Sequence, residues 1–211
     1  MTTYEEIIMG MTKKSLPSVY WADTVGFTEL ESSKHTMQRN GQSVWEHTML
    51  VIDVLADKNP ITLLSGLFHD LGKCCVEPSN NTYSSKFPGH DLESARISTE
   101  VLRRWNAPVN IIDAVFRVII KHMYDISDAS REKTIRKFVA DIGRSNVNNW
   151  FTLRIADSRA YAEQQKYYNR YIDPFRVAIN KYLDQQPNTN EPEIEVSYIV
   201  SGMQIEGGDV K

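Results

Sequence analysis

The chain has 211 residues, of which 41% are apolar and 24% are charged, and its formal net charge at pH 7 is −3. This length and composition predict a globular protein that buries a core without disulfide bonds. The charge gives no reason to expect nucleic acid or an anionic membrane as a partner, and the absence of any run of about 18 apolar residues excludes a membrane-spanning helix.

The first part of the sequence predicts an extension followed by two helices. Residues 1–40 are mixed in character and are expected to form a short helix and loops. Ser43 is a good N-cap, and Glu46 three residues later completes a capping box at the start of a helix. Pro60 begins the next helix, because proline is favoured at the first helical position. This second helix is apolar over much of its surface, so it belongs in the core, and we expect it to stop at Gly72.

The rest of the chain predicts one long loop, five helices and a tail. Residues 76–89 have no hydrophobic period, and loops of that length are often functional. Helices are expected over about 91–105, 109–124, 131–142, 147–168 and 173–185. The tail, 187–211, is expected to be poorly structured or to hold one short strand. The fold class is therefore all-α, with the main domain over 41–186.

The two cysteines and the N-terminal residues indicate a compartment. Cys74 and Cys75 are adjacent, and a disulfide between neighbours is strained, so both thiols are expected to be reduced. The first residues lack the basic start and apolar core of a secretory signal peptide. We therefore expect a cytoplasmic protein.

Four of the five histidines occur in helical or helix-edge segments, near acidic residues. They are His47, His69, His90 and His122, whereas His35 fits no pattern and is assigned to a surface loop.

Two aspartates in apolar surroundings need a partner, since an unpaired buried carboxylate is costly. A metal ion bound jointly with His69 would compensate Asp70. For either aspartate alone, an ion pair with an arginine or lysine, such as Arg154 or Arg159 near Asp157, explains the sequence at least as well. Imidazole and carboxylate together form the ligand set of Zn, Fe, Mn, Ni or Co.

Taken together, these residues resemble the HD superfamily of metal-dependent phosphohydrolases, which is named for an adjacent His-Asp pair. The segments SVWEHTMLVIDVL, LLSGLFHDLGK, FPGHDLESARISTEVLRRWNAP and LRIADSRA are most similar to the HD domain of bacterial CCA-adding enzymes and poly(A) polymerase-like proteins. The likeness covers about residues 40–170 and has no counterpart of the nucleotidyltransferase core, so a free-standing HD domain is expected. The residues that match the family pattern are His47, His69, Asp70, His90, His122 and Asp157.

The resemblance implies a helical bundle with a metal site in its core. One divalent transition metal, Fe, Mn, Ni, Co or Zn, would be held by His47, His69, Asp70 and Asp157. A second would be held by His90 and His122, with Asp70 as a bridging and catalytic residue. Metal-bound hydroxide would then attack a nucleotide-type phosphomonoester or a 2′,3′-cyclic phosphodiester. The expected partner is therefore a small phosphorylated substrate, with an RNA end as a further candidate.

Three basic residues are candidates for contacts with the substrate. Lys73 matches a family position near the phosphate, where its ammonium would stabilise developing charge as a catalytic group. The alternative for Lys73 is a solvated lysine at a helix end. Lys86 lies in the long loop, which would form a rim over the site. Arg159 is the weakest candidate, because it is two residues from Asp157 and so points elsewhere on a helix.

Two other functions are compatible with the same ligands. A few proteins of the HD fold use such residues as di-iron oxygenases that activate O₂. A non-catalytic module that binds RNA or nucleotide could also retain the fold. Retention of all six ligands argues against an inactive site, because crowded buried charges are costly without a metal.

Overall fold

The computed structural model describes residues 4–12, 32–38, 41–56, 58–79, 87–124, 131–160 and 172–186. Within these ranges the regular elements are helices, with one isolated antiparallel bridge between Met37 and Ser43, so the chain is all-α as predicted. None of these helices combines the length and the apolar character that crossing a bilayer requires. The predicted tail at 187–211 and the end of the predicted helix at 161–168 lie outside the described residues.

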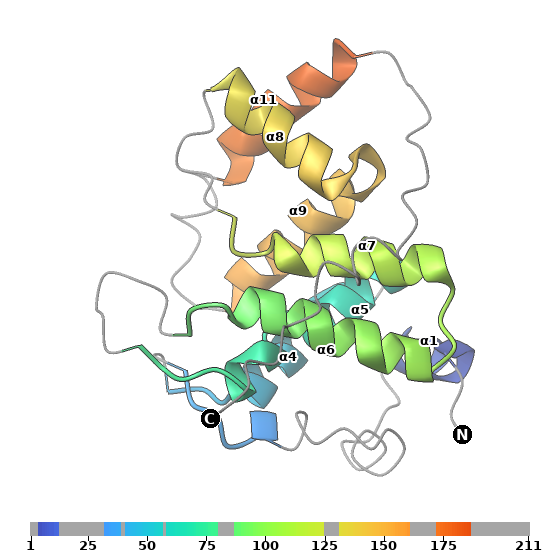
Figure 1. Ribbon diagram of the computed structural model, residues 1–211, viewed down its shortest axis with the longest axis vertical. Coiled ribbons are helices and arrows are strands. Elements are labelled where there is room, and N and C mark those ends of the chain that lie inside the picture. The colour runs from blue at the N-terminus through green and yellow to red at the C-terminus, as the bar shows by residue number, and fades with distance from the viewer. Residues whose placement is uncertain are drawn as a thin grey trace, which may run out of the picture.

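The helices form two groups along the long axis of the molecule (Figure 1). At one end α4, α5, α6 and α7 pack together with α1, and α6 lies alongside α7. At the other end α8 packs against α11, and α9 passes from this pair to α4 and α5. The elements are α1 (Tyr4–Thr12), α4 (Val44–Leu55), α5 (Pro60–Phe68), η1 (Leu71–Cys74, a 3-10 turn), α6 (His90–Arg104), α7 (Val109–Ile120), α8 (Glu132–Ile142), η2 (Arg144–Asn146, a 3-10 turn), α9 (Val147–Ala160) and α11 (Asp173–Asp184).

Local sequence explains where the first helices begin. The Ser43 hydroxyl accepts a hydrogen bond from the Glu46 amide at 3.1 Å, and the Glu46 carboxylate accepts one from the Ser43 amide at 2.8 Å. This is the predicted capping box, which satisfies two amides that have no partner inside the helix. Asn59 caps α5 in the same way by accepting from Thr62 at 3.0 Å, and Pro60 follows as the first helical residue.

Two helices end earlier than the sequence predicts, and in both cases a histidine explains the difference. The predicted helix up to Gly72 stops at Phe68, because the His69 imidazole donates through Nδ1 to the Gly66 carbonyl at 2.8 Å. In a continuing helix that carbonyl would bond to the amide four residues later. Similarly, α7 was predicted to reach residue 124 but ends at Ile120, and His122 Nδ1 donates to the Ile119 carbonyl at 2.6 Å.

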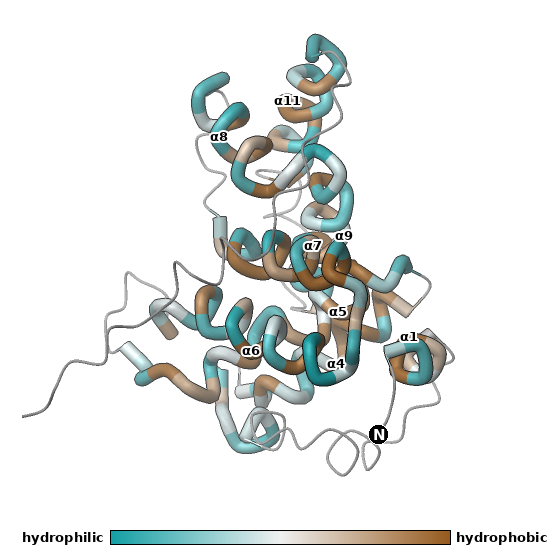
Figure 2. Tube along the Cα trace, turned by 45° about the vertical axis from the view of Figure 1, so that its right-hand side comes forward, coloured by the Kyte–Doolittle hydropathy of each residue, from teal (hydrophilic) through white to brown (hydrophobic). Residues whose placement is uncertain are grey.

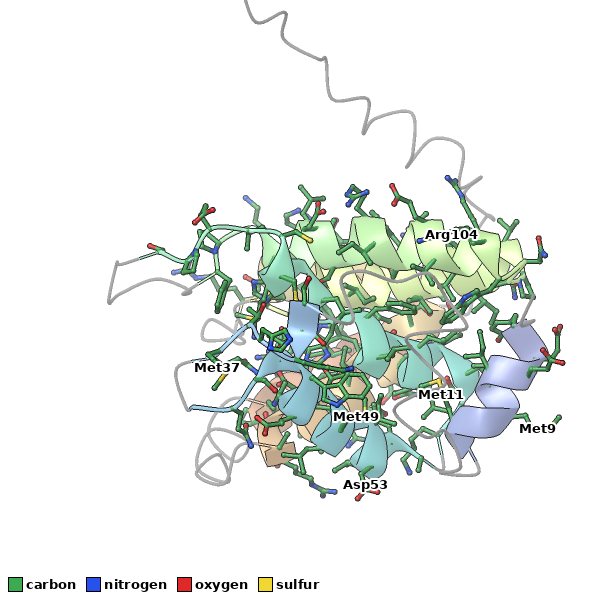
Figure 3. All side chains as sticks on the ribbon, turned by 90° about the horizontal axis from the view of Figure 1, so that it is seen from below. Met9, Met11, Met37, Met49, Asp53 and Arg104 are labelled. Carbon is green, nitrogen blue, oxygen red and sulfur yellow. The ribbon has the colours of Figure 1, made fainter. Side chains whose placement is uncertain are left out.

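A single core joins the N-terminal helix to the rest of the described chain. Ile7 and Met11 of α1 are each 2% exposed in the same cluster as the apolar residues of α4 to α7. Met9 lies on the outer side of α1 and is 54% exposed (Figure 3). The tube coloured by hydropathy shows the same division, with brown faces turned toward neighbouring helices (Figure 2). The helix at the start of the predicted extension 1–40 therefore packs onto the main helical body.

Candidate metal centre

The structure brings the six predicted residues together in the interior. Each comes from a helix or from the turn that flanks one, so the surrounding packing fixes their positions. The residues are His47 in α4, His69 and Asp70 after α5, His90 at the start of α6, His122 after α7 and Asp157 in α9. All except Asp157 are at most 3% exposed, and the Asp157 side chain is 18% exposed. The cluster is therefore almost completely buried, and Asp157 has the most exposed side chain of the six.

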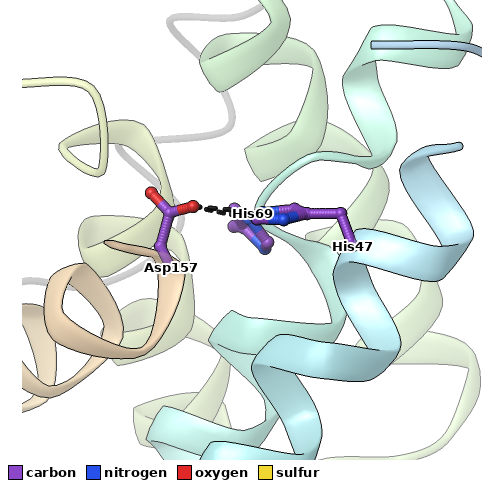
Figure 4. Close-up of side chains that lie close together, drawn as sticks. All are labelled: His47, His69 and Asp157. Carbon is purple, nitrogen blue, oxygen red and sulfur yellow. Dashed lines mark hydrogen bonds and ion pairs between the residues drawn. The ribbon is translucent and has the colours of Figure 1, made fainter. Parts of the chain in front are cut away.

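The first group consists of His47, His69 and Asp157 (Figure 4). The Asp157 Oδ1 atom lies 3.1 Å from His47 Nε2 and 4.0 Å from His69 Nε2. The two Nε2 atoms are 3.4 Å apart. Three potential ligand atoms from three separate elements therefore face one another.

The second group consists of Asp70, His90 and His122. Asp70 Oδ1 lies 3.5 Å from His90 Nε2 and 3.7 Å from His122 Nε2, and the two Nε2 atoms are 3.2 Å apart. The imidazole rings meet edge to face, with centroids separated by 5.1 Å. All three side chains of this group are buried.

Asp70 joins the two groups through its two carboxylate oxygens. While Oδ1 faces the second group, Oδ2 lies 3.4 Å from His69 Nε2 and 3.7 Å from His47 Nε2. One carboxylate therefore presents one oxygen to each group, which is the arrangement of a bridging ligand.

Hydrogen bonds to the main chain fix the imidazoles in a metal-binding form. A carbonyl oxygen only accepts, so His69, His90 and His122 each carry a proton on Nδ1, and their acceptors are Gly66 O at 2.8 Å, Phe87 O at 2.6 Å and Ile119 O at 2.6 Å. In a neutral imidazole with Nδ1 protonated, Nε2 has only a lone pair. With both rings in that form, the Nε2 lone pairs of His90 and His122 would face each other at 3.2 Å, and a cation bound between them would remove the repulsion.

Both groups fit a metal ion in geometry and in chemistry. Imidazole and carboxylate ligands bind Zn²⁺ at about 2.0–2.2 Å, so two ligands of one ion lie roughly 3–4 Å apart. The separations of 3.1 to 4.0 Å in the first group and 3.2 to 3.7 Å in the second match that spacing. The buried clusters can thus hold metal ions, and their ligand types suit Zn, Fe, Mn, Ni or Co alike.

The electrostatics of the site hold its groups in the protonation states that bind metal. Burial alone raises the pKa of the Asp70 carboxyl, but the Lys73 ammonium and the nearby imidazoles outweigh burial and hold that pKa well below its usual value. Burial likewise opposes ionisation of Asp157, and His47 and His69 lower its pKa overall. Burial lowers the pKa of His69 to about 4, against the opposing attraction of Asp70. At neutral pH the carboxyls are ionised and His69 is neutral.

Lys73 lies at the centre and not at a solvated helix end. Its Nζ is 2.5 Å from Asp70 Oδ2 and 2.9 Å from Gln38 Oε1, and its side chain is 12% exposed. Gln38, which the sequence analysis missed, is 7% exposed and sits in a tight turn where its amide donates to Gln42 O at 2.9 Å. The polar segment around it contains several similar residues, so nothing in the sequence distinguished this one.

Of the other two predicted substrate contacts, the structure describes only Arg159, which does not join the site. Lys86 lies outside the described residues, and Arg159 is exposed at the end of α9. Within the described ranges no hydrogen bond or ion pair joins Arg159 to the two groups. The alternative partner for Asp157, Arg154, lies closer, with Nη1 3.9 Å from Asp157 Oδ2. His35 is exposed, as predicted.

Comparisons with known proteins give no assignment: no protein-family model matches the chain, and a search of curated proteins finds no match.

Proposed function

We propose that this protein is a metal-dependent phosphohydrolase of the HD type, acting on a small nucleotide-type substrate. The observation that carries the proposal is the Asp70 carboxylate, which presents Oδ2 to His47 and His69 and Oδ1 to His90 and His122. Together with Asp157, these residues follow one another along the chain in the same order as the ligands of the HD superfamily, which the sequence resembles. The resemblance and the geometry of the two groups both support the proposed function.

Each group would hold one divalent ion, with Asp70 shared between them. When bound, such a pair supplies a water of low pKa as nucleophile and neutralises charge on the phosphoryl oxygens. The protein residues contribute position: main-chain carbonyls fix three imidazoles, and Asp157 is the least buried of the six residues. We expect a substrate phosphoryl group to approach from the side of Asp157.

The Lys73 and Gln38 side chains lie together beside the Asp70 carboxylate. The Lys73 ammonium is held between the Asp70 carboxylate and the Gln38 amide oxygen. In this place it can donate to a phosphoryl oxygen and stabilise the negative charge that grows in the transition state. We expect a phosphomonoester or a 2′,3′-cyclic phosphodiester as substrate, because the closest resemblance is to domains associated with RNA ends.

The proposal is tested by removing metal with a chelator and reloading the protein with Mn²⁺, Ni²⁺ or Co²⁺. We expect the reloaded protein to hydrolyse 2′,3′-cyclic AMP, a 2′-nucleotide or an aryl phosphate, and the chelated protein to be inactive. Iron-dependent O₂ consumption without hydrolysis would favour the oxygenase alternative. A protein that takes up no metal and gains no stability from it would favour a non-catalytic binding module.

Replacing Lys73 by methionine should reduce hydrolysis even in protein that is saturated with metal, because the ammonium is lost while all six candidate ligands remain. Removal of one donor that stabilises transition-state charge costs about 100-fold in kcat or more. The measurement is kcat of the reloaded variant together with its metal content. Lys58→Met, at an exposed position after α4, is the matched control and should retain wild-type activity. A wild-type kcat in the Lys73 variant would contradict the assigned role.

A further inference from the structure

Helix α9 contributes a second charged residue to the centre besides Asp157. Arg154 is 7% exposed and lies three residues earlier on the same helix. Its Nη1 donates to the His122 carbonyl oxygen at 2.7 Å and lies 3.9 Å from Asp157 Oδ2. One guanidinium therefore contacts the main chain of a residue in the second group and approaches the carboxylate of the first.

Trp150 provides a parallel anchor one helical turn before Arg154. Its indole Nε1 donates to the Lys121 carbonyl at 2.7 Å, and its ring lies 5.7 Å from the Arg154 guanidinium carbon. The indole is fully buried and is held by the rings of Phe138 and Phe175. The face of α9 that carries Asp157 thus also holds two consecutive carbonyls of the turn after α7.

These contacts go to two main-chain carbonyls of the turn that follows α7, close to the C-terminal end of that helix. The last carbonyls of a helix lack intrahelical donors, and the negative end of the helix dipole favours a nearby cation. Arg154 supplies both a donor and a positive charge there. The ring of His122 is fixed through Nδ1, and its main chain is fixed through the carbonyl, so the direction of Nε2 depends on both contacts.

We propose that Arg154 is a positioning residue. It holds His122, and with it the second metal-binding group, at a fixed position relative to Asp157. The residue binds neither metal nor substrate directly; it acts through the turn at His122. The inference rests on the proposed metal centre, but not on the identity of the substrate. It predicts that loss of Arg154 weakens binding of the second ion more than binding of the first, although Arg154 ligates neither ion.

The test is a metal titration of the chelated full-length protein with Co²⁺, followed by calorimetry and by the visible absorption of bound Co²⁺. We compare the wild type with Arg154→Met, Arg154→Lys and the exposed control Arg159→Met. A His122→Ala protein identifies which binding step and which absorption band belong to the second group. Loss of a residue that orients a metal ligand typically weakens metal binding about 10- to 100-fold.

We expect Arg154→Met to weaken the second ion by that factor and to change the first ion much less, because the short hydrogen bond goes to His122 and the contact with Asp157 is longer. Arg154→Lys should give a smaller but equally selective loss, since one ammonium can donate to the carbonyl without the planar fork of arginine. Arg159→Met should bind both ions as the wild type does.

If Arg154→Met binds the first ion and the second ion each as tightly as the wild type does, the inference is overturned. If circular dichroism shows that Arg154→Met does not fold, the lysine variant decides: selective loss of the second ion supports the inference, and unchanged binding of both ions overturns it. A wild-type protein that binds no Co²⁺ would instead contradict the proposed function, so the two failures are distinguishable.

Discussion

Asp70→Asn should abolish binding of the second metal ion, weaken binding of the first and lower the rate of hydrolysis by about a thousandfold or more. The carboxylate is the only residue whose oxygens face both groups of the described centre. Two bound ions would together supply several kcal/mol of charge stabilisation in the transition state. Because each 1.36 kcal/mol is tenfold in rate, a loss of about 4 kcal/mol corresponds to that factor.

The amide is a stringent replacement because it keeps the shape of the side chain. Asparagine has no negative charge, and its NH₂ group takes the place of one carboxylate oxygen. Whichever oxygen is replaced, the amide hydrogens point toward imidazole Nε2 atoms 3.4 to 3.7 Å from that position. They would occupy lone pairs that a metal needs.

The measurements for this variant are metal content by elemental analysis and kcat/KM with the best substrate of the screen. Asp53→Asn, an exposed acid on α4, removes the same charge elsewhere and should behave as wild type (Figure 3). Two ions and full activity in Asp70→Asn would contradict the bridging role.

Gly72→Ala should destabilise the protein and disturb the second group, although Gly72 is not a ligand. A Cβ at this position would lie 2.2 Å from the His90 carbonyl oxygen and 2.6 Å from the Ser94 amide nitrogen. The Gly72 amide also donates to Ser94 Oγ at 2.8 Å. The His90 oxygen and the Ser94 nitrogen are main-chain atoms of α6, so relief of the clash requires η1 and α6 to move apart.

Forcing extra volume into a packed interior usually costs about 1–3 kcal/mol, and rigid neighbours place this site at the upper end. For a chain of this size, about 3 kcal/mol corresponds to a fall in Tm of roughly 6–12 °C. We also expect weaker binding of the second ion, because the movement separates Asp70 from His90. Thermal unfolding with and without Co²⁺ measures both effects.

Gly66→Ala is the matched control on the preceding helix. There the new Cβ would meet the end of the Leu55 side chain at 2.6 Å and Val51 at 3.3 Å, so its nearest neighbours are side-chain and not main-chain atoms. Its Tm should fall by less than that of the Gly72 variant. A Gly72→Ala protein as stable as Gly66→Ala would contradict the close approach of η1 to α6.

Much of the fold follows from short-range sequence features. The capping pair Ser43 and Glu46 and the first-turn Pro60 predicted where α4 and α5 begin, and the structure agrees. Their caps depend on residues three positions apart, which sequence displays directly. The meeting of His47 with Asp157, 110 positions along the chain, could not be derived from spacing. It was expected only through the resemblance to a family pattern.

The remaining differences arise where a side chain replaces a main-chain partner. His69 and His122 shorten two helices by bonding carbonyls that the periodic pattern assigned to the helix interior. Gln38 and Arg154 reach the centre through contacts 35 and 32 positions away, to Lys73 and to the His122 carbonyl. Such contacts depend on how whole helices pack, which hydrophobic periodicity does not specify.

The most direct test of the proposed dinuclear centre is anomalous diffraction from crystals of the protein reloaded with Co²⁺ or Mn²⁺. We predict two anomalous peaks, one on each side of the Asp70 carboxylate, each at about 2.0–2.3 Å from the Nε2 atoms of its group. A single peak remote from Asp70, or no peak near His90 and His122, would contradict the account.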